Sequence, residues 1–240
     1  MAAIFQAVSP SILLFALVGG VLPAVLWLLF WLREDARHPE PRSLIIGTFF
    51  AGAFVVIIAL PAEQYSIRLL GGSITVLVLL AWAFIEELLK YLAALGTSFR
   101  SHAFDEPVDA MIYLITAALG FAALENTLFI LKDLLEESST IGILTASMRS
   151  VGATLLHVAA AAVIGGCVAL AFYRSWPLKI IAAISGVLLA TALHLAFNHL
   201  IMLGGGEHTF LVFGALWVLI IGIILFFEKV KHLTRPKIDI

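Results

Sequence analysis

The sequence predicts an all-α fold, a polytopic bundle of about seven transmembrane helices, or eight if one span is poorly marked. Of the 240 residues, 62% are hydrophobic and only 12% are charged, whereas a soluble domain carries about 25% charged residues. The apolar residues come in blocks of roughly 20, which is the length that crosses a bilayer core as a helix. Because these blocks use up most of the chain, we expect one integral membrane domain over residues 1–240.

Seven apolar segments account for the predicted helices, and polar or glycine-containing stretches separate them. The segments are residues 11–32, 43–60, 74–95, 108–131, 147–173, 178–203 and 209–227. The connectors include a charged loop over 33–42, the Pro61-Ala62-Glu63-Gln64 stretch with Gly71-Gly72, an acidic loop over 132–139, and the glycines 204–206. The first segment is longer than the apolar core of a signal peptide and has no basic residue before it, so we expect a retained span.

The distribution of Lys and Arg predicts the orientation of the bundle, because cytoplasmic loops carry an excess of these residues. One side holds ten of them: Arg33, Arg37, Arg42, Arg100, Arg174, Lys179, Lys229, Lys231, Arg235 and Lys237. The other side holds only Arg68 and Lys132. We therefore expect a cell-membrane protein with its N-terminus outside and a short cytoplasmic tail over 229–240. An eighth span would change the side of the N-terminus. The net charge of −2 and the lack of a basic patch argue against a nucleic-acid partner.

The third segment carries three charged residues, in the stretch Glu86-Glu87-Leu88-Leu89-Lys90. At a helix centre each costs about 2.5–3.5 kcal/mol on insertion scales. Their sum is about as large as the free energy that the apolar residues of the segment recover. Glu86 and Lys90 are four residues apart and share a helix face, so they can pair. We expect this helix to face the bundle interior, either for function or as a structural ion pair.

Three further segments each carry polar groups. Glu125 has no basic neighbour on its own segment, so it needs a proton, a metal ion or an imidazole as its partner. His157 lies among small residues, which let helices approach closely. His194 and Asn198 share a face, whereas His199 lies about 140° around the helix from His194 and is not expected to join it. Each of these residues, taken alone, is compatible with a hydrogen-bonded core position.

Depth in the membrane connects these residues. With a helical rise of about 1.5 Å per residue, Glu125, His157 and His194 lie roughly 10–15 Å from the outer edge of the bilayer core. Glu86 lies roughly 20 Å from that edge. Segment ends uncertain by a turn allow one shared layer, near mid-membrane or slightly toward the outside. Four unrelated structural accidents at similar depth are improbable, so we interpret the four residues as one site.

Two imidazoles and one carboxylate match the His2Glu ligand set of a catalytic zinc site, which leaves one position for water. Zinc lowers the pKa of that water to about 7. Glu86 or Glu87 then serves as the general base, and Lys90 holds it ionised. A metal-free mechanism also fits, in which Glu86 takes a proton from water while His194 and Asn198 stabilise the oxyanion. The sequence has no His-Glu-x-x-His and no Gly-x-Ser-x-Gly motif.

Taken together, these motifs resemble the PrsW family of intramembrane proteases, which is similar to the wider CAAX prenyl protease and bacteriocin-immunity (Abi) superfamily. Four motifs carry the resemblance, each on its own segment: Glu86-Glu87-x-x-Lys90, Phe121-x-x-x-Glu125, His157, and His194-x-x-x-Asn198. The surrounding stretches Glu40-Pro41-Arg42, Asp105-Glu106-Pro107-Val108-Asp109 and Gly120-Phe121-Ala122-Ala123-Leu124-Glu125-Asn126 also fit. The resemblance covers about residues 11–230.

The resemblance implies a membrane-embedded endopeptidase that cleaves a membrane-anchored protein, and family members are associated with site-1 cleavage of anti-sigma factors. It implies Glu86 as the catalytic acid, with Glu87 beside it. It also implies metal ligands at Glu125, His157 and His194, with Asn198 as the polar residue after the last His. Zinc is the metal described for this family, whereas the related CAAX proteases are argued to use glutamate without metal. Those relatives have His at the position of Glu125, which points to the PrsW branch.

Two other functions fit the same residues. Intramembrane Glu, His and Lys also mark ion and proton pathways, so an ion- or proton-coupled carrier is one alternative. The two halves of the sequence show no clear repeat of the kind that many transporters contain, which disfavours this alternative. A peptide-binding, immunity-type protein that keeps the site without cleaving is the other alternative, and its motifs would look the same.

Overall fold

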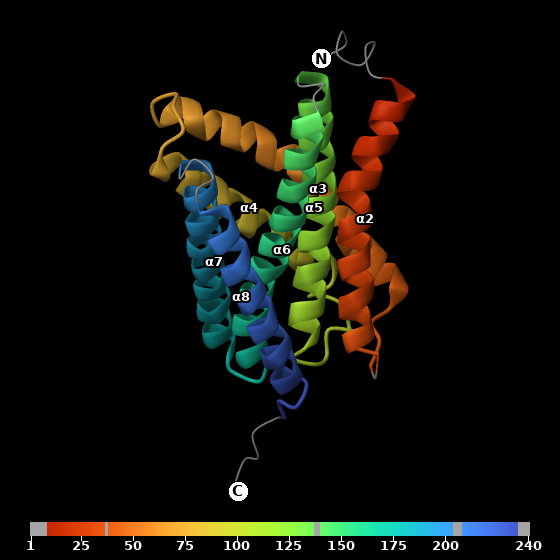
Figure 1. The fold of residues 1–240 in the computed structure, drawn as a ribbon. Coiled ribbons are helices and arrows are strands. Elements are labelled where there is room, and N and C mark those ends of the chain that lie inside the picture. Colours follow the sequence, from red (N-terminus) through yellow and green to blue (C-terminus); the bar gives the residue numbers. More distant parts are fainter. Residues whose placement is uncertain (1–8, 37, 137–139, 204–207, 235–240) are drawn as a thin grey trace, which may run out of the picture.

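The computed structural model describes residues 9–36, 38–136, 140–203 and 208–234, and this part of the chain forms seven long α-helices in one bundle (Figure 1). The elements are α2 (Pro10–Glu34), α3 (Arg42–Leu69), α4 (Val76–Thr97), α5 (Asp109–Glu136), α6 (Thr140–Leu170), α7 (Trp176–Asn198), the π-helical turn η1 (His199–Leu203) and α8 (Thr209–Val230). Among these described helices, all but α4 are long and apolar enough to cross a membrane. The predicted all-α, multi-pass fold is confirmed.

Two helices continue well past the C-terminal ends of the sequence segments that predicted them. Helix α3 continues nine residues beyond Leu60, through Pro61 and Glu63, so the predicted connector there was wrong. Helix α5 continues to Glu136 through most of the predicted acidic loop. Leu, Lys and Glu are strong helix formers, and Pro is tolerated in a transmembrane helix whose neighbours satisfy the backbone. Polar residues therefore extended these helices instead of ending them.

Three other predicted features lie close to or beyond the residues that the structure describes. The predicted span 178–203 is α7 followed by η1, so its last turn is π-helical. The predicted glycine break at 204–206 lies outside the described residues. The predicted tail over 229–240 overlaps the end of α8, which continues to Val230, and residues 235–240 are also outside the description.

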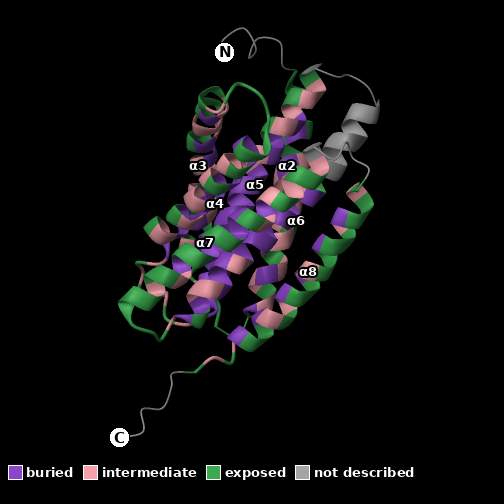
Figure 2. Ribbon diagram, turned by 90° about the vertical axis from the view of Figure 1, so that its left-hand side faces the viewer, coloured by how far each residue is buried: buried purple, intermediate pink, exposed green. Residues whose placement is uncertain are grey.

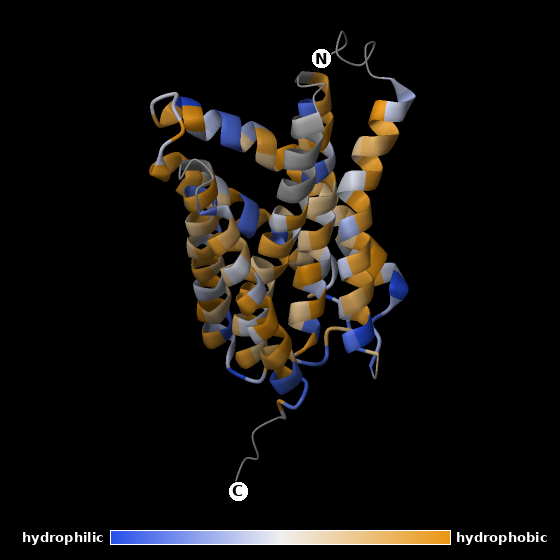
Figure 3. Cartoon of the chain, in the orientation of Figure 1, coloured by the Kyte–Doolittle hydropathy of each residue, from blue (hydrophilic) through white to orange (hydrophobic). Residues whose placement is uncertain are grey.

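Helices α5 and α6 form the centre of the bundle (Figure 2). Every side chain from residue 107 to 123, and from 154 to 162, is buried. The surrounding helices leave large apolar side chains exposed, among them Phe50, Trp176 and Phe210. Figure 3 shows helices made mostly of hydrophobic residues, with hydrophilic residues in the loops, at helix ends and in a few places within the bundle. Such an exterior requires lipid as its solvent.

Helices α3 and α5 cross with their backbones in contact, and two glycines permit this. A Cβ atom at Gly52 of α3 would lie 1.9 Å from the carbonyl oxygen of Ala117. A Cβ atom at Gly120 of α5 would lie 1.9 Å from the carbonyl oxygen of Phe49. Backbone atoms cannot yield as a flexible side chain can, so only glycine fits either position. The crossing also sets the height of Glu125, which follows Gly120 on α5.

The helices alternate in direction, so α2 begins and α8 ends at opposite ends of the bundle (Figure 1). The loops after α2, α4 and α6 therefore lie at the end of the bundle where α8 ends. These are the loops that, with the tail, hold the excess of Lys and Arg. Six of the seven helices qualify as spans by length and composition and α4 does not, so the number of crossings and the direction of the bundle in the membrane stay predictions.

Candidate active site

Charged side chains from four helices meet inside the bundle. Helix α4 contributes three of them and α5, α6 and α7 one each: Glu86, Glu87, Lys90, Glu125, His157 and His194. We call these six residues the buried cluster. Glu87 and Lys90 are fully buried, and Glu125 is the most exposed member, with 16% of its side chain accessible. The structure thus brings together six of the seven residues that the sequence singled out for the site.

The buried cluster is built on the inner face of α4. Glu86, Glu87 and Lys90 share that face with Ala83, which is fully buried. The outer face of the same helix shows apolar side chains, including Phe84. The charges of this segment therefore point away from lipid, as the insertion penalty required.

Lys90 is the cation at the centre of the buried cluster. Its Nζ donates to Glu87 Oε1 at 2.7 Å and to Glu86 Oε2 at 3.5 Å. The expected pair with Glu86 is present, but the shorter contact is to Glu87. Lys90 Nζ also lies 4.5 Å from the centre of the Phe121 ring, within the range of a cation–π contact. One ammonium group therefore balances two carboxylates.

His157 connects Lys90 to Glu125. Its Nδ1 lies 2.7 Å from Lys90 Nζ, and its Nε2 lies 2.8 Å from Glu125 Oε2. An ammonium group has no lone pair and can only donate, so Nδ1 of His157 accepts and Nε2 carries the proton. The Nε2–H group then donates to the carboxylate of Glu125. Glu125 has the imidazole partner that its isolated position on α5 required.

His194 is oriented by Glu87 and faces Glu86. Its Nδ1 lies 2.7 Å from Glu87 Oε1, so Nδ1 carries the proton and donates to the carboxylate. This leaves the lone pair of Nε2 free, and Nε2 lies 3.9 Å from Glu86 Oε2. A lone pair and a carboxylate oxygen that face each other are stabilised by a proton, a water molecule or a cation between them.

The residues fit a metal ion. Glu86, Glu87, His157 and His194 each offer a ligand atom, and these atoms lie within 4.8 Å of one another. Glu87 Oε2 is buried and has no hydrogen-bond partner among the described residues. Imidazole nitrogens and carboxylate oxygens are the donors that zinc takes in catalytic sites. The compact group differs from the predicted ligand set, since it contains Glu86 and Glu87 and leaves out Glu125, which lies beside His157.

Asn198, the seventh predicted site residue, lies apart from the buried cluster. It is half-buried at the end of α7, one turn beyond His194. Within the described part of the chain it makes no hydrogen bond to any of the six residues. The structure therefore leaves its predicted role in the reaction as a prediction.

One further carboxylate was missed in the sequence. Glu63 was assigned to a connector, but the extension of α3 makes it helical and half-buried. Its carboxylate interacts electrostatically with Glu125, and more weakly with Lys90. Trp82 Nε1 on α4 donates to the Glu63 carbonyl oxygen at 3.1 Å, which ties the two helices together one turn from Glu86. The sequence could have indicated a helical Glu63, because a proline such as Pro61 does not necessarily end a transmembrane helix.

Comparison with known proteins supports the resemblance. Residues 40–226 match the model of a family described as the PrsW family intramembrane metalloprotease. Protease PrsW of Geobacillus kaustophilus is 28% identical over 60% of this chain and 64% of its own length. Protease PrsW of Bacillus subtilis is 27% identical over 57% of this chain and 64% of its own length. The chain thus spans less than two thirds of these relatives. No solved structure matches.

Proposed function

The chain belongs to the PrsW family of intramembrane metalloproteases, and on this premise we propose that it hydrolyses a peptide bond of a membrane-anchored protein. The observation that carries the proposal is the compact group in which Glu86, Glu87, His157 and His194 bring ligand atoms within 4.8 Å. Water is scarce in the bilayer core, so an enzyme that cuts a peptide bond there must hold and activate its own water. That requirement accounts for charged groups that burden the insertion of α4.

We propose zinc as the metal, held by His157, His194 and Glu125. Zinc polarises a carbonyl group and acidifies a bound water. The lone pair of His194 Nε2 is already free to bind an ion. His157 would exchange its hydrogen bond to Glu125 for a bond to the ion, because both of its ring nitrogens are engaged. Glu87 Oε2 is the unpaired buried oxygen that also favours a cation here.

The contacts of Glu86 and Glu87 indicate different roles for these two neighbouring residues. Glu87 accepts from both Lys90 and His194 at 2.7 Å, so we propose that it orients the imidazole and fixes its tautomer. Carboxylates commonly do this for metal-bound histidines. Glu86 is held less tightly and faces His194 Nε2. We therefore propose Glu86 as the general base, with its charge supported by Lys90, and Asn198 as a donor to the developing oxyanion.

The experiment is cleavage of a single-span reporter, built on a membrane-anchored anti-sigma factor, by protein reconstituted in liposomes. Glu86→Gln keeps the shape of the side chain but cannot take a proton, so we expect cleavage to fall at least about a hundredfold. Asp133→Asn is the matched control. Asp133 lies on α5 outside the buried cluster, so this variant should cleave like the wild type. Undiminished cleavage by Glu86→Gln would overturn the assignment of the base.

The metal is tested separately by elemental analysis of the purified protein. We expect about one zinc per chain, because two imidazoles and a carboxylate that can reach one buried ion bind it tightly. His194→Ala should lose the metal, while His199→Ala, on the exposed next turn, should retain it. Full activity in protein that contains no metal would favour the glutamate mechanism instead.

A further inference from the structure

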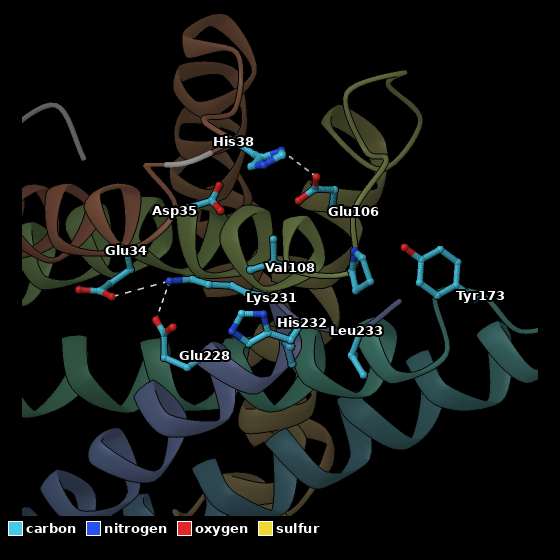
Figure 4. A pocket seen from close by; sticks show the side chains of 12 residues that line it. Glu34, Asp35, His38, Glu106, Val108, Tyr173, Glu228, Lys231, His232 and Leu233 are labelled. Carbon is cyan, nitrogen blue, oxygen red and sulfur yellow. Dashed lines mark hydrogen bonds and ion pairs between the residues drawn. The ribbon is translucent and has the colours of Figure 1, made fainter. Parts of the chain in front are cut away.

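A second group of acidic side chains lies at the other end of the bundle, where α2 and α8 end (Figure 4). A cavity of about 700 Å³ opens there, and we call it the Asp35 pocket. The residues that matter for its chemistry are Glu34, Asp35, Glu106, Tyr173, Glu228 and Lys231. The Asp35 pocket lies at the end of the bundle where α8 ends, far along the helices from the buried cluster.

Most of the charges in the Asp35 pocket are paired. Lys231 Nζ donates to Glu228 Oε1 at 2.6 Å and lies 3.9 Å from Glu34 Oε2. His38 Nδ1 lies 2.9 Å from Glu106 Oε1. Figure 4 shows these pairs as dashed lines around the pocket. Lys231 and His38 are therefore already engaged by carboxylates.

Asp35 is the exception. Its side chain is only 5% exposed, and its Oδ2 has no hydrogen-bond partner among the described residues. Asp109 behind it is committed elsewhere, because its Oδ2 accepts from the backbone N–H groups of Asp105 and Glu106 at 2.9 and 2.7 Å. Burial, and then the charges of Asp109 and Glu106, raise the pKa of Asp35 to about 7. A donor that entered the pocket would complete the bonding of this carboxyl.

The size and the geometry favour an organic cation over a metal ion. A hard divalent ion needs several oxygens converging on one point. Among the described residues, the acidic side chains of this pocket do not form such a compact group. The volume lies in the range of cavities that hold organic groups. A guanidinium group presents five N–H donors in a planar fork that matches a carboxylate, and it stacks on aromatic rings such as that of Tyr173.

We propose that the Asp35 pocket binds an arginine side chain from the basic segment that flanks the transmembrane helix of a membrane-anchored protein on its cytoplasmic side. The basic flanks of single-span proteins gather on the cytoplasmic side. The pocket lies at the end of this bundle where its own Lys and Arg gather, so the basic flank of a neighbouring span reaches the same depth. The identification of that neighbour as a substrate rests on the proposed function, and the pocket then fixes the depth at which the substrate docks.

The test uses full-length protein in nanodiscs of zwitterionic lipid. The probe is a synthetic single-span peptide with two arginines after its apolar helix, and association is measured by fluorescence energy transfer. We expect Asp35→Asn to weaken association at least tenfold. A peptide with citrulline in place of arginine should bind the wild type as weakly as the arginine peptide binds Asp35→Asn. Asp105→Asn is the matched control, since Asp105 is exposed at the same end but does not line the pocket.

Equal binding by Asp35→Asn and wild type, or by the citrulline and arginine peptides, would overturn the proposal. So would calorimetric binding of Mg²⁺ alone that Asp35→Asn abolishes, because the pocket would then be an inorganic cation site. Asp35→Asn removes an unpaired carboxyl and should unfold at the same temperature as wild type or higher. If it does not fold, Glu106→Gln tests the same pocket, with binding expected several-fold weaker, and unchanged binding would count against the proposal.

The two proposals fail in different ways. The Glu86→Gln variant should bind the arginine peptide as wild type does, because binding needs no hydrolysis. A wild type that binds but never cleaves would remove the proposed function and leave the pocket. Cleavage of the reporter that is unaffected by Asp35→Asn, together with unaltered binding, would remove the pocket alone.

Discussion

At the scale of single residues, Lys90 is the side chain that holds the buried cluster together. It is fully buried and contacts Glu86, Glu87 and His157 within 3.5 Å. A charge in such a position is stable only with its partners, and removal of one partner is more damaging than removal of both. The spacing of Glu86 and Lys90 in the sequence predicted a pair, but the shorter contact is to Glu87. In the structure Glu87 also binds His194 and Lys90 also binds His157, and these contacts between helices are not contained in a local sequence pattern.

We predict that Lys90→Met destabilises the protein by about 3–5 kcal/mol, because it leaves Glu87 buried without its counter-charge. Adding Glu87→Gln removes the orphaned charge and keeps the hydrogen bond to His194. The double variant should therefore be more stable than Lys90→Met alone. Unfolding in detergent, followed by tryptophan fluorescence, gives the four free energies of the cycle. Additive effects of the two substitutions would show that the pair contributes no coupling.

We predict that the stability of the protein depends on pH through Asp35, whose carboxyl oxygen Oδ2 has no hydrogen-bond partner among the described residues. Its carboxyl ionises near pH 3.8 in an ordinary environment, and burial raises the pKa to about 7 in the folded protein. Between these values the folded state holds the proton more tightly, so the free energy of unfolding falls as the pH rises. Asp35→Asn removes this loss. The variant should gain roughly 1–4 kcal/mol over wild type at pH 8, because tenfold in proton affinity is about 1.4 kcal/mol.

The measurement is the unfolding temperature of both proteins at pH 5 and pH 8. The difference between them should be larger at pH 8. Lys231 and His38 lie near enough to lower the pKa of Asp35, whereas Asp109 and Glu106 raise it. A difference that stays constant between the two pH values would mean that Asp35 ionises as in solvent.

At the scale of the helices, composition predicted the elements and misplaced their ends. An apolar segment marked each of the seven described α-helices, although α4 alone is not apolar enough to qualify as a membrane span. The same criterion ended the second segment at Leu60 and so missed Glu63. A polar residue near the end of a span looks like a connector in sequence. In the structure α3 continues through Glu63, whose carbonyl oxygen accepts from Trp82 of α4. The residues of the buried cluster were found because each one violates the apolar pattern of its span.

We predict that the α3–α5 crossing tolerates no side chain at Gly52. In Gly52→Ala the new Cβ would meet a backbone oxygen at 1.9 Å, so the helices must separate. We expect a loss of about 1–3 kcal/mol or more. Gly47→Ala is the matched control on the same helix, since nothing lies within 4 Å of its Cβ position. It should be neutral or stabilising by up to about 1 kcal/mol.

Thermal unfolding in detergent compares the two alanine variants with wild type. Gly52→Ala should also lower cleavage of the reporter, because the crossing sets the height of Glu125 on α5. Equal unfolding temperatures for Gly52→Ala and Gly47→Ala would contradict the close crossing.

At the scale of the whole molecule, the bundle separates two polar regions along its axis. The buried cluster lies midway along α4 and close to the last turns of α7, while the Asp35 pocket lies at the end that carries the C-terminus. The sequence predicted the first region, since its charges interrupt apolar spans. It did not predict the second, because acidic residues in loops are ordinary, and only the fold shows that Asp35 is buried beside a cavity.

The orientation of the molecule gives the last prediction, because it decides which region faces which compartment. Helix α4 separates Ser73 from His102, both of which are exposed. In a Cys167→Ala background, Ser73→Cys should react with a membrane-impermeant maleimide in intact spheroplasts, and His102→Cys should react only after lysis. We expect His102 in the cytoplasm, because the excess of Lys and Arg lies at its end of the bundle. Reaction of both positions before lysis would show that α4 does not cross the membrane. Reaction of His102→Cys alone would reverse the orientation, place the Asp35 pocket outside, and remove it from the reach of a cytoplasmic basic flank.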